Sequence, residues 1–380
     1  MKKLNSKLWT LLSLVGVLCA SLSLASCSGV IFYTIREEVE LDDAVISGDI
    51  RNIVRYQLDG VENLFVTNGK IYCRSIDTEH DVDGNEVTDF NDSVAAKKID
   101  WTVFERPSKG AYAMAADSAN LYVLSLLYED DDDGYNVATT RTLYCYSDGA
   151  WTSIWSGEFS SSTSAAIFCT NSPKNAHRKA YFRYGTTVYE LNGTSDMTEL
   201  ATGDTNNATV PTTGVRACVY AEFDDNVYFT SNYAMTSNET TADPTDADYG
   251  YTPYIYYATG DNVYYTADGS WEGYSDLSCD TILSLAVTND YLLAGTDEGI
   301  VHTTWASENI PSAGTADFST NADSTLSSYY VVNCLLAVDP SRDETAGTLY
   351  GAIDMSGTPA SLNNVGLWSY YAYKGKWNRE

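Results

Sequence analysis

Two short acidic stretches carry the residues that could bind a metal ion. Residues 79–84 and 129–134 each end in Asp-Gly, with carboxylates at alternate positions before the glycine. These carboxylates are Asp81, Asp83, Asp131 and Asp133. Calcium binds such oxygen ligands, but the twelfth position of a calcium loop should be a bidentate glutamate, and here it is Phe90 or Thr140. We expect solvated acidic turns and no cofactor, with a bridging calcium ion as the alternative.

The short motifs of common enzyme classes are absent from the sequence. There is no Gly-x-Ser-x-Gly, no His-Glu-x-x-His and no phosphate-binding Gly-x-x-x-x-Gly-Lys. His80, His177 and His302 lie far apart, so we expect each in a loop or packed in the fold. Five arginines could bind a carboxylate if the fold brought them together. They are Arg74, Arg141, Arg183, Arg216 and Arg342.

The first 27 residues have the three-part composition of a secretory signal. Three lysines within residues 1–7 precede an uncharged run over residues 8–24, and small residues then lead to Cys27. The sequence Leu24-Ala25-Ser26-Cys27 resembles the lipobox of bacterial lipoproteins. In that family the chain is cleaved at the bond between Ser26 and Cys27, and Cys27 is acylated on its thiol and its new α-amine. A plain signal peptide and an uncleaved anchor helix are the alternatives.

This resemblance implies a protein anchored to a lipid bilayer through acylated Cys27. A buried acyl methylene contributes about 0.8 kcal/mol, and two or more chains make a stable anchor. In Gram-negative members of the family, an aspartate after the cysteine tends to retain the protein at the inner membrane. Ser28 stands there in this chain, which implies the outer membrane, on its periplasmic or its surface face.

The charge balance excludes some partners. The chain has 52 acidic and 22 basic residues, and three of the lysines belong to the predicted signal. Such a surface repels nucleic acid and anionic headgroups. The 30 tyrosines, 8 tryptophans and 10 phenylalanines argue against disorder.

Six cysteines remain after Cys19 and Cys27 are set aside. They are Cys73, Cys145, Cys169, Cys218, Cys279 and Cys334. Their even number and an exported location are compatible with disulfides. Three of them lie in apolar runs at similar points of a repeat, so we favour buried thiols.

Beyond the signal, short apolar or alternating runs are separated by turn residues, which predicts an all-β fold. One apolar run recurs about every fifty residues, with one longer gap. Its copies are Leu64–Val66, Tyr112–Ala116, Ala165–Cys169, Ala217–Ala221, Ile282–Val287 and Leu335–Val338. A second strand follows each copy, marked by Tyr72, Tyr122, Tyr181, Tyr228, Leu292 or Tyr350.

A tyrosine followed seven residues later by a tryptophan occurs three times. The pairs are Tyr144 and Trp151, Tyr264 and Trp271, and Tyr370 and Trp377. A turn lies between the members of each pair, and two of these turns contain Asp-Gly, the sequence of a tight hairpin. The pattern predicts a third strand, a turn and a fourth strand. We expect these aromatic side chains to pack between adjacent sheets.

Four antiparallel strands in forty-odd to fifty residues make one blade of a β-propeller. We therefore predict an all-β propeller of six four-stranded blades, with seven as the alternative. The predicted organisation is a signal over residues 1–26, a lipidated segment over 27–59 whose strands could close the ring, and the propeller over 60–380. The Tyr–Trp spacing is similar to the second half of a kelch repeat, and residues 266–271 resemble a shortened Asp-box of sialidase-like propellers. Both motifs are incomplete and imply the architecture alone. The polar stretches 234–252 and 306–328 predict loops.

Two functions fit these observations. The first is a non-catalytic envelope lipoprotein whose propeller is a binding scaffold for a protein or a glycan. Acidic, tyrosine-rich loops favour a basic or polar partner over an anion. The second is an exported, sialidase-like carbohydrate-active enzyme, whose arginines, tyrosine and acid would meet at the mouth of the propeller.

Overall fold

In the computed structural model, the described parts of the chain consist almost entirely of β-strands. The described residues are 46–76, 101–130, 136–160, 162–201, 215–222, 226–233, 252–259, 262–265, 282–287, 291–296, 299–305, 311–315, 331–338, 348–354, 366–371 and 376–380. Within them lies one short 3-10 helix, Asn175–His177.

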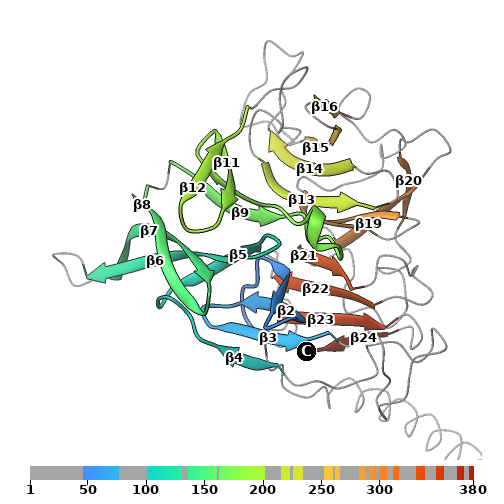
Figure 1. Cartoon of the computed structure of the whole chain (residues 1–380). Helices are drawn as coiled ribbons and strands as arrows, with labels where there is room; N and C mark the ends of the chain where they lie inside the picture. Colours follow the sequence, from blue (N-terminus) through green and yellow to red (C-terminus); the bar gives the residue numbers. More distant parts are fainter. Residues whose placement is uncertain are drawn as a thin grey trace, which may run out of the picture. The chain divides into compact units, whose positions relative to one another are not determined.

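The strands form six four-stranded sheets (Figure 1). The first sheet contains β1 (Ile53–Leu58), β2 (Val61–Thr67), β3 (Ile71–Ser75) and β4 (Thr102–Phe104). The second contains β5 (Ala111–Ala116), β6 (Leu121–Asp130), β7 (Asn136–Ser147) and β8 (Ala150–Glu158). The third contains β9 (Ala165–Cys169), β10 (Ala180–Tyr184), β11 (Thr187–Asn192) and β12 (Asp196–Glu199).

The other three sheets repeat the same order. The fourth contains β13 (Val215–Ala221), β14 (Asn226–Tyr233), β15 (Thr252–Thr259) and β16 (Asn262–Tyr265). The fifth contains β17 (Ile282–Val287), β18 (Tyr291–Thr296), β19 (Gly299–Trp305) and β20 (Pro311–Thr315). The sixth contains β21 (Val331–Ala337), β22 (Thr348–Asp354), β23 (Gly366–Tyr371) and β24 (Lys376–Arg379).

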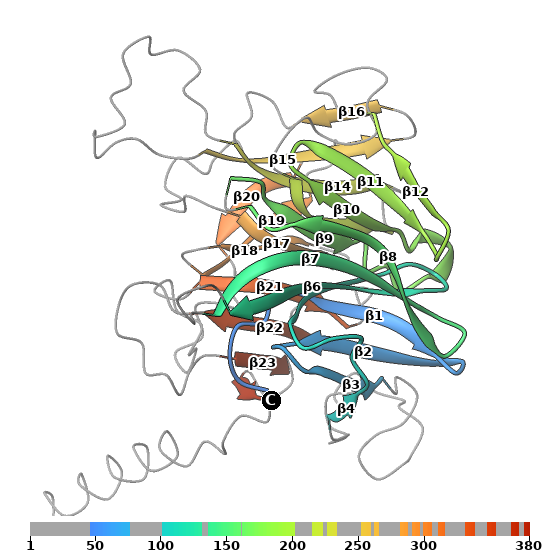
Figure 2. The ribbon, with the colours of Figure 1, turned by 90° about the vertical axis from the view of Figure 1, so that its left-hand side faces the viewer.

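In every sheet, strands that follow one another in the chain are hydrogen-bonded neighbours. Their defined pairs are antiparallel, as between β1 and β2 or β5 and β6. The predicted all-β fold built from four-stranded antiparallel sheets is therefore confirmed. All six sheets lie within one compact unit that spans residues 44–378 (Figure 2).

The first strand of each sheet packs beside the first strand of the next sheet. β1 contacts β5, β5 contacts β9, β9 contacts β13, β13 contacts β17, and β17 contacts β21. β21 in turn contacts β1, so this series of contacts includes all six sheets and returns to the first.

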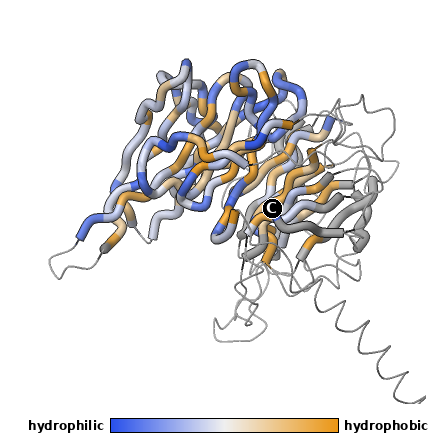
Figure 3. Tube along the Cα trace, turned by 90° about the horizontal axis from the view of Figure 1, so that it is seen from below, coloured by the Kyte–Doolittle hydropathy of each residue, from blue (hydrophilic) through white to orange (hydrophobic). Residues whose placement is uncertain are grey.

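Crowding of the first strands explains their composition. Every residue of β5 except Tyr112 is buried, and every residue of β13 except Arg216 is buried. A strand packed on both faces reads as a continuous apolar run of small or branched residues rather than as an alternating one. Figure 3 shows hydrophobic stretches within the strands and hydrophilic residues at many of the turns.

Two Asp-Gly turns have the conformation that their sequences predict. Asp148 and Gly149 connect β7 to β8 with φ values of 52° and 82°. Asp59 and Gly60 connect β1 to β2 with φ values of 51° and 81°. Positive φ at both central residues is the type I′ turn, whose twist matches that of the two strands it joins.

Asparagine side chains connect first strands that belong to different sheets. Asn52, just before β1, accepts a hydrogen bond from the Met114 amide at 2.8 Å and donates one to the Ile167 carbonyl at 3.1 Å. Asn171, just after β9, accepts from the Arg55 amide at 3.1 Å and donates to the Ile53 carbonyl at 2.8 Å. These bonds satisfy backbone groups between sheets where no ladder pairs them.

The first and sixth sheets are joined around Glu380. Its carboxylate accepts hydrogen bonds from Arg74 at 2.8 Å, from Trp101 at 2.9 Å and from Ser369 at 2.5 Å. Arg74 and Glu380 are 6% and 9% exposed, so this ion pair is buried. Trp101 also packs edge-on against Tyr350 of β22, with ring centroids 6.4 Å apart.

The predicted first strand of the first sheet was wrong. Leu64–Val66 lies in β2, the second strand, and Tyr72 lies in β3, the third. The first strand is β1, so the sheets begin at residue 53, inside the segment 27–59 that the sequence set apart. Arg55 interrupts the apolar run of β1, yet it is only 4% exposed because its guanidinium donates to the carbonyls of Ala337 and Val338.

Two further strand predictions need correction in the later sheets. Tyr264 was expected on a third strand but lies on β16, the fourth strand of its sheet. Thr259 pairs with Asn262, which places the β15–β16 hairpin at residues 260–261, before the predicted turn at 268–269. The sequence there is Gly-Asp, which suits a type II′ turn. β20 lies within the predicted loop 306–328.

No helix among the described residues is long and apolar enough to cross a membrane. The predicted signal and lipidation site, including Ser26 and Cys27, lie outside the described residues.

Substituting Glu380 by alanine should destabilise the protein, because Arg74 would lose the buried side-chain carboxylate that it contacts at 2.8 Å. Loss of one partner of a buried ion pair costs about 3–5 kcal/mol. We expect a corresponding fall in the denaturant midpoint, measured by tryptophan fluorescence. Glu199→Ala is the matched control, since Glu199 is exposed on β12. Equal effects of the two substitutions would contradict this role of the ion pair.

Candidate ligand-binding site

Four of the first strands contain a β-bulge at the same place near their start. The register shifts around Tyr112 in β5, Arg216 in β13, Leu283 in β17 and Asn333 in β21. Each residue at a bulge is half-buried. In β5, β13 and β17 the residues before and after it in the strand are buried. A bulge redirects a side chain out of the regular ladder and is common beside functional sites.

Arg216 has two arginines as electrostatic neighbours. Arg183 lies on β10, and its Nε donates a 2.7 Å hydrogen bond to the carbonyl of Val215, the residue before Arg216. Burial, and then the charge of Arg216, lower the pKa of Arg183 to about 10. The pKa of Arg216 is lowered by burial and then by the charge of Arg51.

Both shifts show that the folded protein disfavours these cations. Because the folded pKa of Arg183 lies below its ordinary value of 12.5, its positive charge opposes folding at every pH below about 10. The penalty decreases only when the pH rises through that value. An anion that binds beside such a cation should therefore stabilise the folded protein.

Tyr112 connects Arg51 to a fourth arginine. The Arg51 guanidinium lies 5.8 Å from the centroid of the Tyr112 ring, and Arg141 acts electrostatically on the Tyr112 phenol. Burial raises the pKa of Tyr112, although Arg141 and Arg51 both oppose the rise. The phenol is therefore protonated at neutral pH and can donate a hydrogen bond.

Arg141 is buried without a carboxylate partner among the described residues. It is 8% exposed, and its Nη1 donates to the Thr163 carbonyl at 2.5 Å. Its guanidinium also lies 4.5 Å from the centroid of the Phe159 ring. The Nε of Arg141 is buried with no hydrogen-bond partner within the described part of the chain.

We call Arg51, Arg141, Arg183, Arg216 and Tyr112 the arginine cluster. Among the described residues, the one carboxylate paired with it is Asp49, whose Oδ2 lies 3.0 Å from Arg51. Asn333 donates to the other oxygen of Asp49 at 3.3 Å. Arg51 precedes β1 and Arg216 lies near the start of β13, whereas Arg141 lies on β7 and Arg183 on β10.

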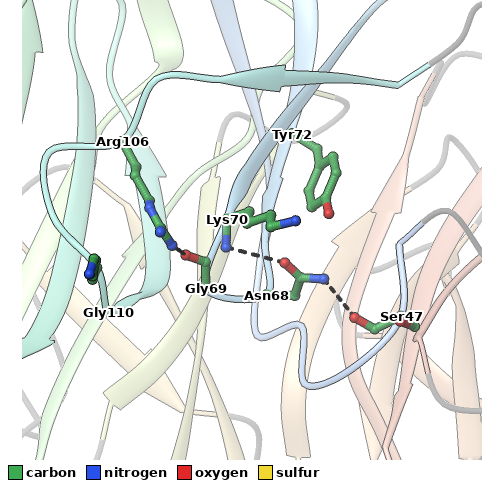
Figure 4. Close-up of a pocket in the computed structure, with 8 residues that line it drawn as sticks. Ser47, Asn68, Gly69, Lys70, Tyr72, Arg106 and Gly110 are labelled. Carbon is green, nitrogen blue, oxygen red and sulfur yellow. Dashed lines mark hydrogen bonds between the residues drawn. The ribbon is translucent and has the colours of Figure 1, made fainter.

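A pocket of about 540 Å³ lies beside the β2–β3 turn (Figure 4). Its lining residues are Ser47, Asn68, Gly69, Lys70, Tyr72, Arg106, Lys109 and Gly110. Three of these residues are cationic and none is acidic. We call it the basic pocket.

A second polar cluster surrounds Glu222, just after β13. Its carboxylate accepts hydrogen bonds from Ser172 at 2.6 Å and Lys174 at 2.5 Å, and it lies 3.1 Å from His177 Nδ1. Burial alone would raise the pKa of Glu222, but these hydrogen bonds lower it. His177 also packs against Tyr220, with ring centroids 4.2 Å apart. Ser172, Lys174 and His177 lie in the connection from β9 to β10 and Glu222 follows β13, so this cluster joins the third and fourth sheets.

The predicted metal ligands Asp81, Asp83, Asp131 and Asp133 lie outside the described residues. Within the described ranges, no three histidine, cysteine or acidic side chains come close enough to hold a metal ion.

The predicted packing residues are placed in part. Tyr144 lies on β7 and Trp151 on β8, where the Trp151 ring packs on Phe104 of the first sheet at 6.4 Å and on Tyr146 at 5.1 Å. Tyr370 lies on β23 and Trp377 on β24, and Trp271 lies outside the described residues.

Five of the six mature cysteines are described, and all five are free thiols. They are Cys73, Cys145, Cys169, Cys218 and Cys334, of which Cys73 is half-buried and the others are buried. Burial raises the pKa of Cys145 to about 12 and that of Cys169 to about 11. The four buried thiols therefore stay protonated and serve as small apolar groups.

Of the five arginines considered as a carboxylate grip, Arg216 acts electrostatically on Arg183, and Arg141 acts on Tyr112. Arg74 is held instead by Glu380, and Arg342 lies outside the described residues. Sequence reasoning did not single out Arg51, or Tyr112 as part of a site. The available signal was a large or polar residue at the second position of an otherwise apolar first strand.

No protein-family model matches this chain, and no curated protein matches it. Among solved structures, the SapL1 lectin in complex with alpha methyl fucoside is 12% identical, with 87% of this chain and 95% of that chain covered and a TM-score of 0.44. AofleA from Arthrobotrys oligospora is 9% identical, with coverage of 90% and 88% and a TM-score of 0.43.

The PQQ-bound aldose sugar dehydrogenase from Streptomyces coelicolor is 7% identical, with coverage of 87% and 96% and a TM-score of 0.42. At this level of similarity, none of the three structures assigns a family or a function to this chain.

Substituting Arg216 by methionine should stabilise the protein without ligand, because it removes a half-buried cation beside two other arginines. Replacing buried charge by an apolar side chain of similar volume is neutral or stabilising by up to about 4 kcal/mol. We expect a gain of about 1 kcal/mol, seen as a higher Tm. Arg51→Met is the control, since Arg51 is exposed and paired with Asp49. A lower Tm for Arg216→Met would contradict the unpaired state of this guanidinium.

Proposed function

We propose that this protein is a non-catalytic, membrane-anchored binding module whose arginine cluster holds the acidic group of a glycan. The six sheets are the blades of a closed β-propeller in this proposal. The series of contacts among the six first strands supports it, as do the hydrogen bonds that join the first and sixth sheets around Glu380.

The main observation behind the proposal is that the Arg216 guanidinium lacks a partner among the described residues. Within the described residues its guanidinium has no hydrogen-bond or ion-pair partner, while Arg183 and Arg51 raise the local positive charge. A guanidinium offers a planar fork of donors that matches a carboxylate or a sulfate. The bulge in β13 presents this fork at the start of a first strand.

Two further bulges carry polar groups that suit a sugar bearing the acidic group. The phenol of Tyr112 can donate a hydrogen bond, and Asn333 occupies the matching bulge of β21. Hydroxyl groups of a saccharide need such neutral donors and acceptors, whereas a lone oxyanion does not. The cluster thus combines a charged anchor with neutral polar groups.

The proposed anionic ligand differs from the sequence-based expectation of a basic or polar partner. That expectation rested on the net charge of −30 and the acidic loops. The Debye length is about 8 Å at physiological ionic strength, so distant acidic groups are screened. Arginines in direct contact with the ligand are screened much less, and they decide the sign of the charge that binds.

We also propose that acylated Cys27 anchors the protein in the cell envelope, on the outer membrane. The support is the lipobox-like sequence that ends at Cys27. Anchoring would hold the binding module at a surface where it meets its glycan at high effective concentration.

Substituting Cys27 by serine should release the protein from the membrane, because serine lacks the thiol that receives the diacylglycerol. We expect the wild-type chain in the membrane pellet and the Cys27→Ser chain, expressed in the same host, in a soluble fraction or uncleaved. Ser28→Ala is the control and should stay in the pellet. Mass spectrometry of the mature N-terminus checks the modification, and an unmodified Cys27 in the membrane-bound chain would refute the anchor.

A carbohydrate-active enzyme is the second candidate, because the charges of Arg141 and Arg51 act on the Tyr112 phenol. A tyrosine nucleophile needs a neighbouring base that favours its ionised form. Burial instead raises the pKa of Tyr112, and no carboxylate contributes to that pKa. The arrangement therefore favours binding over catalysis.

Substituting Arg216 by glutamine should weaken binding of an acidic oligosaccharide by about 1.5–3 kcal/mol, the contribution of a hydrogen bond to a charged group. Trigalacturonate and sulfated oligosaccharides are the probes, and calorimetry on the full chain in detergent is the measurement. The uncharged methyl ester of trigalacturonate and the Lys179→Gln variant are the matched controls.

Two results would reject the binding proposal. One is equal affinity for the acid and its methyl ester, or equal affinity of wild type and Arg216→Gln for the acid. The other is steady hydrolysis of acidic glycosides that the Tyr112→Phe variant loses, which would establish the enzyme instead.

A further inference from the structure

The basic pocket is separate from the arginine cluster in its residues but lies near it along the chain. Ser47 precedes Arg51 by four positions, and Gly110 precedes Tyr112 by two. Its wall comes from three segments: residue 47 before β1, the β2–β3 turn with the start of β3, and the connection from β4 to β5. None of its eight residues belongs to the arginine cluster.

The pocket contains cations that nothing in the described residues neutralises. Lys70 and Lys109 are exposed and form no ion pair within that part of the chain. Arg106 donates a hydrogen bond to the Gly69 carbonyl, which fixes its guanidinium at the wall (Figure 4). In a chain with 52 acidic residues, a pocket with three cations and no carboxylate favours an anion.

Neutral polar groups complete the lining. The Asn68 side chain donates to the Ser47 carbonyl at 2.7 Å and accepts from the Lys70 amide at 3.2 Å, so it ties two wall segments together. Tyr72 is 9% exposed, and Figure 4 shows its hydroxyl and the Lys70 side chain directed to the same part of the pocket. A hydroxyl beside an ammonium group can bind a charged ligand that also carries hydroxyls.

Two glycines hold the backbone of the pocket in place. Gly69 has φ of +102°, a conformation that side chains disfavour. Gly110 has φ of +151°, and a Cβ there would lie 2.0 Å from the Leu126 carbonyl oxygen. The connection between β4 and β5 is therefore packed tightly on β6, and this wall is formed before any ligand arrives.

We infer that the basic pocket is a second binding site, which holds one acidic sugar unit through Lys70, Lys109 and Arg106. Its volume of about 540 Å³ is typical of small-molecule sites and far exceeds what one oxyanion fills. The inference takes its ligand class from the proposed function but rests on different residues. Together the two sites would hold two acidic units of one glycan chain, which increases avidity without new contacts.

The test measures the reactivity of individual lysines in the full chain. Acetic anhydride labels exposed amines, and mass spectrometry reports the rate at each lysine. Trigalacturonate should slow the labelling of Lys70 and Lys109 about tenfold, while Lys179 at the start of β10 keeps its rate. The methyl ester of trigalacturonate should protect neither. The Arg216→Gln variant, in which the arginine cluster is impaired, should retain the protection.

A second measurement uses the double variant Lys70→Gln, Lys109→Gln. Both side chains are exposed, so the fold should tolerate their replacement. We expect about tenfold weaker binding of trigalacturonate than in wild type, with Lys179→Gln unchanged.

Several outcomes would overturn the pocket while leaving the arginine cluster intact. One is wild-type binding of trigalacturonate, sensitive to Arg216→Gln, without protection of Lys70 and Lys109. Another is equal protection by inorganic phosphate at the same concentration, which would indicate a simple oxyanion site. A third is protection by phosphatidylglycerol vesicles and not by the sugar. Failure of the proposed function alone would appear as protection of the lysines with no effect of Arg216→Gln on affinity.

Discussion

The fold depends on the packing of six first strands against one another. Each of them contacts the first strands of two other sheets, so its residues are buried on both faces. Small and branched apolar side chains such as Ala115 and Val219 satisfy this constraint, and a charged side chain within the strand does not. Polar residues are therefore confined to the strand ends, where a bulge can turn them out of the ladder. Two members of the arginine cluster, Tyr112 and Arg216, lie at such bulges.

The buried and half-buried arginines differ in whether their guanidinium groups have partners. Arg55 and Arg74 are buried but bound, the first by two carbonyls of β21 and its neighbour, and the second by Glu380. Arg216 is not bound in this way within the described residues. The contrast shows that the fold has the means to neutralise a buried guanidinium, and that at Arg216 it leaves the donors available. Stability is reduced at that position, which is typical of residues retained for binding.

Parts of this arrangement could be predicted. The Asp148-Gly149 turn followed from its dipeptide, because the φ values that a type I′ turn requires depend on those two residues alone. Five of the six first strands were placed by their apolar runs. A strand over residues 49–58 was expected within the segment before the propeller, but not as the first strand of the first sheet. Its place there depends on tertiary contacts, such as the hydrogen bonds of Arg55 to carbonyls almost three hundred residues away. The third and fourth strands around Tyr264 were shifted because two hairpin dipeptides, at 260–261 and 268–269, compete within a few residues.

The sequence by itself determined the class of the fold, because strand periodicity, turn dipeptides and repeat length are local properties. It also contained the lipobox-like end at Cys27, where the chemistry depends on four adjacent residues. Only the tertiary structure decided which cations meet. Arg51, Arg183 and Arg216 are spread over more than 160 positions, and their charges act on one another because the first strands of the six sheets pack together. Electrostatic interaction depends on distance in space, and no local pattern in the chain encodes that distance.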